Sequence, residues 1–313
     1  MSAAIDSLLE GCIDYAGLFP PANLDLNEAI DIFTADRKGK NQDWLQHFIL
    51  PAARIQEFDS LRENRGRKSH WTLSLIMGGG ETLHDWQKSV EDVLEPFAAR
   101  DIKKTDLVRV IEISMPHAIA ADADSFTQAI ENLERQLAST SLADCMLFIE
   151  TTSADHRRVL AQVLAARSSH TRKIGLKLRT GGLTQDHFPS VSQLADCLQL
   201  CHSLDIQWKA TAGLHHPLPS DCKRTNAKMH GFLNLLCAVI LLEGSKLPIN
   251  QIEDVLTDRN PDHFVFDDTG VSWMGITADL EQIRLGRERF LSFGSCSFAE
   301  PLEDLTALGL LNS

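Results

Sequence analysis

Two lysines lie inside apolar segments that run into glycine-containing turns. Lys177 lies in Ile174-Gly-Leu-Lys-Leu-Arg-Thr-Gly-Gly182, and Lys209 lies in Ile206-Gln-Trp-Lys-Ala-Thr-Ala-Gly213. A lysine in the middle of a buried strand is costly, because its ammonium group loses its water. An amine beside a second cation gives up its proton more easily and can then act as a nucleophile near neutral pH. The two segments therefore indicate an enzyme.

Two glutamates lie in further apolar segments, Glu112 within 107–114 and Glu150 at the end of 145–150. Because side chains alternate along a strand, Lys177 and Arg179 share one face, and the leucines beside them share the other. If the polar faces converge, two lysines, one arginine and two glutamates meet in one cavity, where Glu112 or Glu150 moves protons. The alternative is a structural network of ion pairs, such as Glu150 with Lys177.

Short apolar runs alternate with longer segments of helical period along the chain. The expected strands are 15–19, 47–50, 72–77, 107–114, 145–150, 174–179 and 206–211, and the expected helices are 26–37, 54–63, 81–99, 124–138, 155–168, 190–203 and 229–243. This alternation indicates βα units and a parallel sheet.

Seven or eight such units in 313 residues favour a single-domain (β/α)8 TIM barrel over residues 1–313, with a doubly wound open sheet as the alternative. The eighth strand is either 290–294 or material from 263–273. Asp268-Thr-Gly270 lies between two apolar runs, so residues 263–273 are expected to form a small β-hairpin insertion.

Barrel enzymes build their active sites at the C-terminal ends of the strands. The candidate substrate-binding residues lie at or after the last expected strands: Arg179, Thr180, Gly181, Gly182, Thr211, Gly213, His215, His216, His230 and Ser295. Free backbone N–H groups at the helix start beside His230, and in the small turn around Ser295, suit an anion. An ordinary turn is the alternative at Ser295.

The two lysine segments resemble the class I (Schiff-base) aldolases, most closely deoxyribose-phosphate aldolase. That family is a (β/α)8 barrel with a Lys-x-x-Thr-Gly pattern on its sixth strand, which Lys177, Thr180 and Gly181 match. It also has a lysine four residues before a glycine on the seventh strand, which Lys209 and Gly213 match. The resemblance implies that Lys177 forms an imine, that Lys209 helps to deprotonate it, and that the glycine-rich turns hold a phosphate.

The chain departs from that family at two positions. Ser114 stands where the fourth-strand Glu-Ile-Asp pattern has its aspartate, and Gly182 stands where a basic residue helps to bind phosphate. The whole chain also resembles a bacterial (β/α)8-barrel family that has no assigned activity. The signatures that carry this second resemblance are Phe19-Pro-Pro21, Arg179-Thr-Gly-Gly182, Lys209-Ala-Thr-Ala-Gly-Leu-His-His-Pro217, Met229-His-Gly231 and Gly294-Ser-Cys-Ser-Phe298.

A second function class is a metal-dependent lyase or hydrolase that uses His215 or His216, His230 and a carboxylate, for which Asp14 and Glu112 are candidates. The spacing of these histidines matches no standard zinc signature. Adjacent histidines on an extended backbone point in opposite directions, so at most one of His215 and His216 is expected to face the site. A third class is a non-catalytic barrel that binds a small molecule.

The amino-acid composition limits the classes of molecule that the protein is expected to bind. A net charge of −13 disfavours nucleic acid and anionic membranes, so the expected partner is a small, anionic substrate. Seven cysteines without a Cys-x-x-Cys pair, together with an N-terminus that lacks a signal peptide pattern, indicate a reduced, cytoplasmic protein. The longest apolar stretch is too short to span a bilayer. No cofactor or metal is expected, and a homo-oligomer is compatible with these features.

Overall fold

The computed structural model describes residues 2–65, 72–98, 107–151, 153–167 and 173–311. Eight strands close into a parallel barrel in the order β1-β13-β7-β6-β5-β4-β3-β2, which confirms the predicted TIM barrel. These strands are β1 (Ile13–Tyr15), β2 (Leu45–Pro51), β3 (Thr72–Met77), β4 (Val108–Ser114), β5 (Met146–Glu150), β6 (Ile174–Arg179), β7 (Trp208–Thr211) and β13 (Phe290–Ser295). The segment beginning at Phe290, and not the insertion, is therefore the eighth strand.

The chain divides into two compact units. The central unit comprises Leu24–Thr34 and His47–Leu178, and the terminal unit comprises Met1–Asn23, Ala35–Gln46 and Arg179–Ser313. Lys177 belongs to the central unit and Lys209 to the terminal unit.

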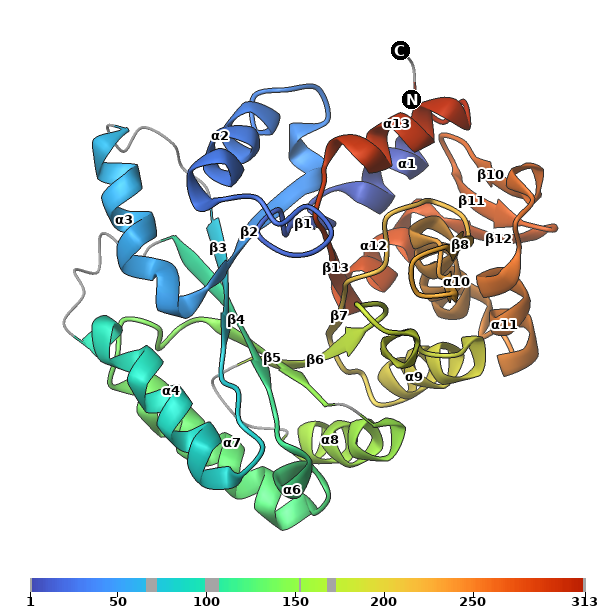
Figure 1. The fold of residues 1–313 in the computed structure, drawn as a ribbon. Coiled ribbons are helices and arrows are strands. Elements are labelled where there is room, and N and C mark those ends of the chain that lie inside the picture. The colour runs from blue at the N-terminus through green and yellow to red at the C-terminus, as the bar shows by residue number, and fades with distance from the viewer. Residues whose placement is uncertain (1, 66–71, 99–106, 152, 168–172, 312–313) are drawn as a thin grey trace. The chain divides into compact units, whose positions relative to one another are not determined.

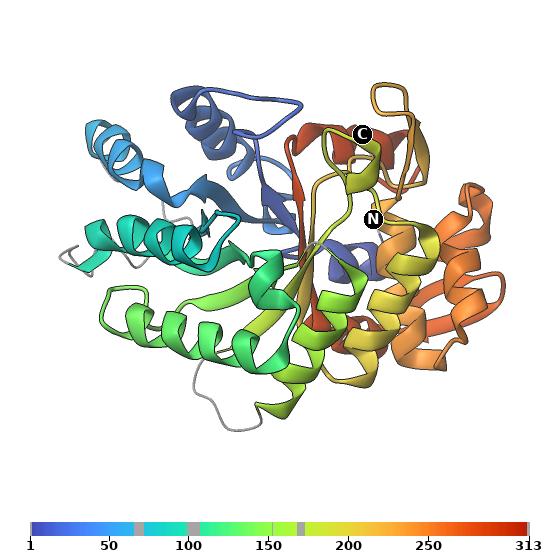
Figure 2. The same cartoon turned by 60° about the horizontal axis from the view of Figure 1, so that its bottom comes forward.

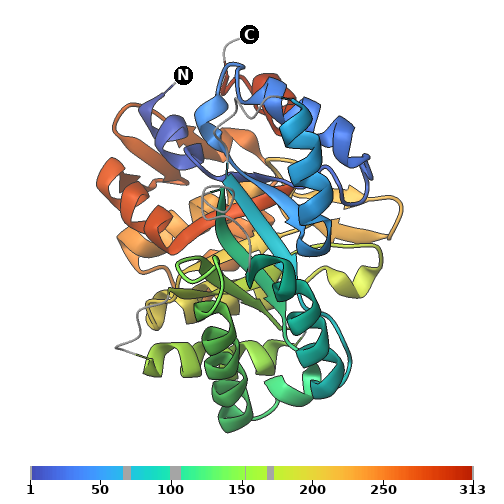
Figure 3. The same cartoon turned by 90° about the vertical axis from the view of Figure 1, so that its left-hand side faces the viewer.

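In the central unit, adjacent strands place the charged residues next to one another. Ser114 of β4 pairs with Glu150 of β5, and Glu150 pairs with Lys177 of β6. β3 and β4, both teal, run side by side in the centre of Figure 3. The helices whose bounds lie in this unit are α3 (Ile55–Asn64), α4 (Leu83–Ala98), α6 (His117–Ala120), α7 (Ala123–Ala138) and α8 (Ala154–Ala166), with the short 3₁₀ helix η2 (Ala52–Arg54). Helix α2 (Leu26–Asp36) begins in this unit.

Sequence explains where these helices begin and which face they bury. Asp122 caps α7 by accepting a hydrogen bond from the backbone N–H of Ser125, and Ser153 caps α8 in the same way. The buried side chains of α7 recur at helical spacing: Phe126, Ile130, Leu133 and Leu137. α7 and α8, both green, lie side by side in Figure 2.

The terminal unit holds β1, β13 and β7 in parallel, with Asp14 beside Gly294 and Ala210 beside Phe293. Its helices are α1 (Ala3–Leu9), α9 (Val191–Ser203), α10 (Phe232–Ser245), α11 (Ile249–Thr257), α12 (Leu280–Arg289) and α13 (Ala299–Ala307), with 3₁₀ helices η1 (Gln42–Trp44), η3 (Gln185–His187) and η4 (Pro261–His263). Figure 1 shows α10 among α9, α11 and α12, which explains why almost all of its residues are apolar and buried.

Two expected boundaries are wrong. The first strand is Ile13–Tyr15 and not 15–19, because the backbone N–H of Phe19 turns back to the carbonyl of Ala16. Helix α10 begins at Phe232 and not at Met229, because β8 (Ser220–Cys222) and β9 (Ala227–Met229) form a separate antiparallel pair. The first correction puts Asp14 in the middle of a barrel strand.

The insertion is larger than the expected hairpin at 263–273. It is a three-stranded sheet of β10 (Phe264–Phe266), β11 (Gly270–Trp273) and β12 (Ile276–Asp279). The additional strand follows a second tight turn, in which Met274 and Gly275 both have positive φ. That is the backbone that a two-residue hairpin turn requires.

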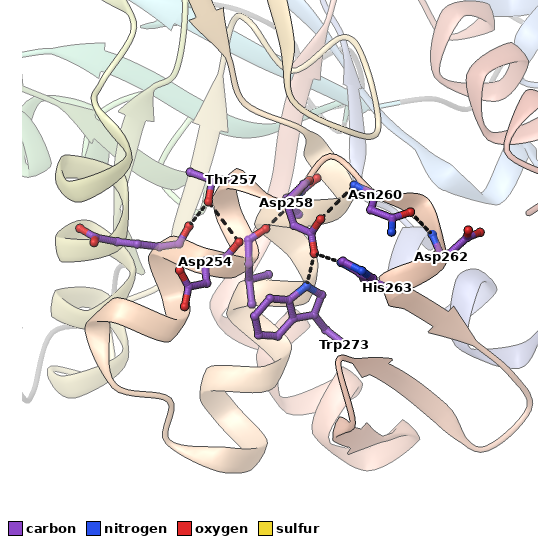
Figure 4. A network of polar contacts seen from close by, with 10 residues as sticks. Asp254, Thr257, Asp258, Asn260, Asp262, His263 and Trp273 are labelled. Carbon is purple, nitrogen blue, oxygen red and sulfur yellow. Dashed lines mark hydrogen bonds and ion pairs between the residues drawn. The ribbon is translucent and has the colours of Figure 1, made fainter.

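Asp258 anchors the insertion to the end of α11 (Figure 4). Its Oδ2 accepts a hydrogen bond from Trp273 Nε1 and contacts His263 Nδ1, both at 2.7 Å. The side-chain amide of Asn234 in α10 donates to the carbonyl oxygens of Val255 and Asp258, each at 2.7 Å. No helix within the described ranges is long and apolar enough to cross a membrane.

Candidate active site

Lys177 lies between two carboxylates in the central unit. Its Nζ is 2.8 Å from Glu112 Oε2 and 3.1 Å from Glu150 Oε2. The three side chains come from β6, β4 and β5 and are almost completely buried, with Glu112 fully so. The ammonium group has therefore exchanged water for two opposite charges, the arrangement that a buried charge requires.

Ser74 of β3 holds the first of these carboxylates in place. Its hydroxyl donates to Glu112 Oε1 at 2.6 Å, and its side chain is fully buried. Each carboxylate oxygen of Glu112 thus has its own partner, Ser74 on one side and Lys177 on the other. A carboxylate that is held at both oxygens has a fixed orientation toward the amine.

Lys209 has a matching arrangement in the terminal unit. Its Nζ donates to Asp14 Oδ2 at 2.6 Å, and the Ser292 hydroxyl donates to the same oxygen at 2.6 Å. Asp14 is fully buried and Lys209 is 1% exposed. Each unit therefore contains a buried lysine, carboxylate and serine, and the central unit adds a second carboxylate, Glu150.

The predicted glycine turn after β6 is held by backbone contacts. Thr180 N–H donates to the carbonyl of Thr211 at 2.9 Å, and the Thr180 hydroxyl donates to the carbonyl of Ala212 at 2.5 Å. Gly213 has φ +77°, and a Cβ there would lie 2.6 Å from the carbonyl oxygen of Thr180. Gly181 approaches Gly213 just as closely. Glycine is required at both positions because the two turns touch through their backbones.

Three further candidate substrate-binding residues lie near this turn, and they differ in burial and in the groups they contact. Arg179 ends β6 with an exposed side chain. Gly182 packs against the imidazole of His187, which leaves no space for a side chain. His230 is 5% exposed, and its Nε2 lies 2.8 Å from the carbonyl of Pro189. Burial lowers the pKa of His230, so the neutral ring donates to Pro189 and ties down the end of this loop.

His215 and His216 both contact α13. His215 Nδ1 lies 3.2 Å from Glu300 Oε2, and His216 Nδ1 lies 2.7 Å from Asp304 Oδ2. The expectation that they point in opposite directions is wrong, because this segment is bent and not extended, and Glu300 and Asp304 are one helical turn apart. Burial lowers the pKa of His215, and Glu300 opposes that effect.

The turn after β13 contains a thiol beside His215. Cys296 Sγ lies 3.8 Å from His215 Nδ1, so it has an imidazole neighbour that the sequence did not reveal. Burial raises the pKa of Cys296, which keeps the thiol protonated and poorly nucleophilic. The Ser295 hydroxyl donates to the carbonyl of Ser297 at 2.6 Å and thus stabilises its own turn.

The histidines do not converge on a metal site. His215 and His216 bind two different residues of α13, and His230 binds the loop before α9. Within the described part of the chain, no group of three histidine, cysteine or acidic side chains is placed to hold a metal ion. The geometry therefore gives no support to the metal-dependent alternative.

Sequence reasoning missed the two serines and gave Asp14 only a tentative place as a metal ligand. Ser74 lies in Thr72-Leu-Ser-Leu-Ile-Met77, and Ser292 lies in Phe290-Leu-Ser-Phe-Gly294. A single hydroxyl inside an apolar strand is the signal that could have identified both, because a buried hydroxyl needs a partner.

No family model and no curated protein sequence matches the chain. Among solved structures, a dihydrodipicolinate synthase, described as the first monomeric variant of that enzyme, is similar with a TM-score of 0.41 and 11% sequence identity. The similarity covers 81% of this chain and 80% of that one. It is too weak to assign a function, and the barrel follows from the strand order of this chain.

Proposed function

We propose that this chain is a lysine-dependent lyase of the aldolase type, which acts on a small anionic carbonyl compound through an imine. The observation that carries the proposal is the position of Lys177 between two buried carboxylates, Glu112 and Glu150. Imine formation needs an amine that can lose its proton and an acid that can protonate the departing oxygen. One lysine and two carboxyl groups supply both.

The charges of this cluster support a mobile proton. The two carboxylates contact the same ammonium group, and all three side chains are buried. Two neighbouring carboxylates in a buried place resist ionising together. We infer that the cluster keeps an additional proton. Since Ser74 and Lys177 fix Glu112, we assign the proton transfer to Glu150.

The groups of this cluster supply and accept every proton that the proposed reaction moves. The Lys177 ammonium gives a proton to Glu112, and the resulting neutral amine forms a bond to the carbonyl carbon while the carbonyl oxygen takes a proton from the Glu150 carboxyl group. The attacking nitrogen then loses a proton to the Glu150 carboxylate, which passes it to the same oxygen. That oxygen leaves as water, and the cationic imine remains. Cleavage of the adjacent carbon–carbon bond sends its electron pair to the imine, while the Glu150 carboxylate takes the proton of the hydroxyl group on the departing fragment.

Lys209 contacts a single carboxylate oxygen in the terminal unit. Its Nζ donates to Asp14 Oδ2, which also accepts from the Ser292 hydroxyl. Lys177 lies instead beside two carboxylates, which can take up and return protons. We therefore assign the nucleophile to Lys177 and an electrostatic role to Lys209.

Borohydride trapping tests this assignment. The protein is incubated with a panel of aldehydes and 2-oxo acids, reduced, and mapped by peptide mass spectrometry. We expect an adduct at Lys177 that Lys177→Met removes. Lys173→Met is the matched control, because Lys173 is exposed just before the same strand and should leave trapping unchanged.

Three results would change the assignment. An adduct at Lys209 would move the nucleophile to the terminal unit. An adduct that Lys173→Met removes would show that an exposed lysine had reacted and not Lys177. If no member of the panel is trapped, while a ligand still stabilises both the wild type and Lys177→Met, the chain is a binding protein and not an imine enzyme.

A further inference from the structure

Two polar atoms near the start of α8 are buried without a hydrogen-bond partner, and a mostly buried arginine lies in the same turn. Thr151 follows Glu150 directly, and its hydroxyl has no hydrogen bond; the same holds for His156 Nδ1. Arg157 is 8% exposed, and its guanidinium forms no ion pair or side-chain hydrogen bond within the described residues. Thr151 is 4% exposed and His156 is 7% exposed, so water does not compensate for the missing partners.

Arg157 is a mostly buried residue whose guanidinium has no counter-ion among the described residues. Charges that lose much of their water in proteins are normally paired. Arg157 also lies near the first turn of α8, where the helix dipole is positive and repels a cation. The backbone N–H groups of Ala154 and Asp155 have no acceptor within the helix. A guanidinium and free N–H groups at one helix end are the elements of an anion site.

No acidic side chain next to Arg157 in the chain takes the place of the anion. Asp155 is the adjacent carboxylate, but its side chain is exposed and forms no ion pair with Arg157. Glu150 is directed to Lys177. The His156 ring lies 4.3 Å from the ring of His117, and burial followed by the nearby His117 lowers the pKa of His156. A neutral His156 can donate from Nδ1 to an anion without adding a second buried charge.

We propose that Thr151, His156, Arg157 and the N-terminal end of α8 bind a small oxyanion, either a carboxylate or a phosphate. Thr151 follows Glu150 directly in the chain, so the site belongs to the same unit as the amine cluster. The anion site does not depend on the proposed function.

Calorimetric titration tests the site, with inorganic phosphate and acetate as probes at constant ionic strength. We expect saturable binding of at least one probe by the wild type, and a loss of affinity of at least about tenfold in Arg157→Gln. Arg158→Gln is the matched control, because it removes the same charge from the next, exposed position of α8 and should bind like the wild type. The probe that binds more tightly identifies the oxyanion.

A second variant keeps the proposal testable if Arg157→Gln does not fold. Thr151→Val keeps the shape of the side chain and removes the hydroxyl, and it should weaken binding several-fold in a folded protein. Equal binding by Arg157→Gln and Arg158→Gln would overturn the proposal. So would the absence of binding by the wild type, or a loss of binding in Arg179→Gln alone.

Lys177→Met separates this inference from the proposed function. It should keep phosphate or acetate binding while it loses the trapped adduct. Arg157-dependent binding without any adduct would sustain the anion site and reject the imine. If an adduct forms at Lys177 but Arg157→Gln binds phosphate or acetate as tightly as the wild type, the imine mechanism stands and the anion site is rejected.

Discussion

The Nζ of Lys177 lies 2.8 Å from Glu112 Oε2, and the side chains are 5% and 0% exposed. An ion pair buried to this extent contributes little net stability, but it is costly to break, because the remaining charge has no water. This relationship makes the cluster a sensitive site for substitution.

Lys177→Met should make stability depend on pH in a defined direction. The substitution removes the ammonium group that both buried carboxylates, Glu112 and Glu150, contact. Protonated carboxyl groups tolerate burial and ionised ones do not, so the variant should be less destabilised at pH 5 than at pH 8. Urea unfolding of the wild type and the variant at both pH values measures the difference. Equal destabilisation at the two pH values would contradict the burial argument.

Asp14→Asn should destabilise the terminal unit by about 3–5 kcal/mol, because it removes the charge of the carboxylate that the buried Lys209 ammonium contacts at 2.6 Å. Ser292→Ala should cost less, about 2 kcal/mol, because Lys209 still pairs with Asp14. Chemical unfolding followed by circular dichroism measures both. Asp221→Asn is the control, since it breaks an exposed pair with Arg259 and should change stability little. A cost for Ser292→Ala above that of Asp14→Asn would refute this ranking.

Gly213→Ala and Gly275→Ala separate backbone strain from steric clash. Both glycines have positive φ, but a Cβ on Gly275 meets open space, whereas one on Gly213 meets the carbonyl of Thr180. Gly275→Ala should cost about 1–2 kcal/mol from backbone strain alone. Gly213→Ala should cost clearly more and should also impair trapping at Lys177, because it displaces the turn that follows β6. Similar melting temperatures for the two variants would show that the turns can separate without penalty.

His230→Gln should flatten the dependence of stability on pH below neutrality. Burial lowers the pKa of His230, so the folded state binds a proton less readily than the unfolded state, and stability falls as the pH drops below about 6.5. Glutamine keeps a donor for the Pro189 carbonyl but does not titrate. Melting curves between pH 5 and pH 8 compare the variant with the wild type and with the exposed control His84→Gln. Parallel curves for all three proteins would rule out His230 as a source of the acid sensitivity.

Cys222 should be the first of the seven cysteines to react with iodoacetamide in the folded protein. It is partly exposed, whereas the other six are buried. Burial raises the pKa of Cys12 to about 11 and that of Cys237 further, so these two thiols should react last or only after unfolding. Peptide mapping after brief alkylation gives the order, and early modification of Cys296 would mean that its turn opens in solution.

The barrel could be predicted from the sequence, with an open sheet as the alternative, because alternating strand and helix patterns depend on local periodicity, which each segment carries on its own. Lys177, Lys209, Glu112 and Glu150 could be proposed as candidates, since charged residues inside apolar strands are conspicuous in the sequence. The sequence analysis misplaced the first strand and missed the third strand of the insertion, where turns of a few residues decide the boundary.

Only the tertiary structure decided how these residues pair. Lys177 with Glu112 and Ser74, and Lys209 with Asp14 and Ser292, join strands that are far apart in the chain, and contacts at that separation leave no local pattern. The same holds for Arg157, which looks like an ordinary helix arginine in the sequence but has no side-chain partner among the residues that the structure describes. Its burial depends on which face of α8 packs inward, and that is set by the neighbouring elements and not by the residue itself.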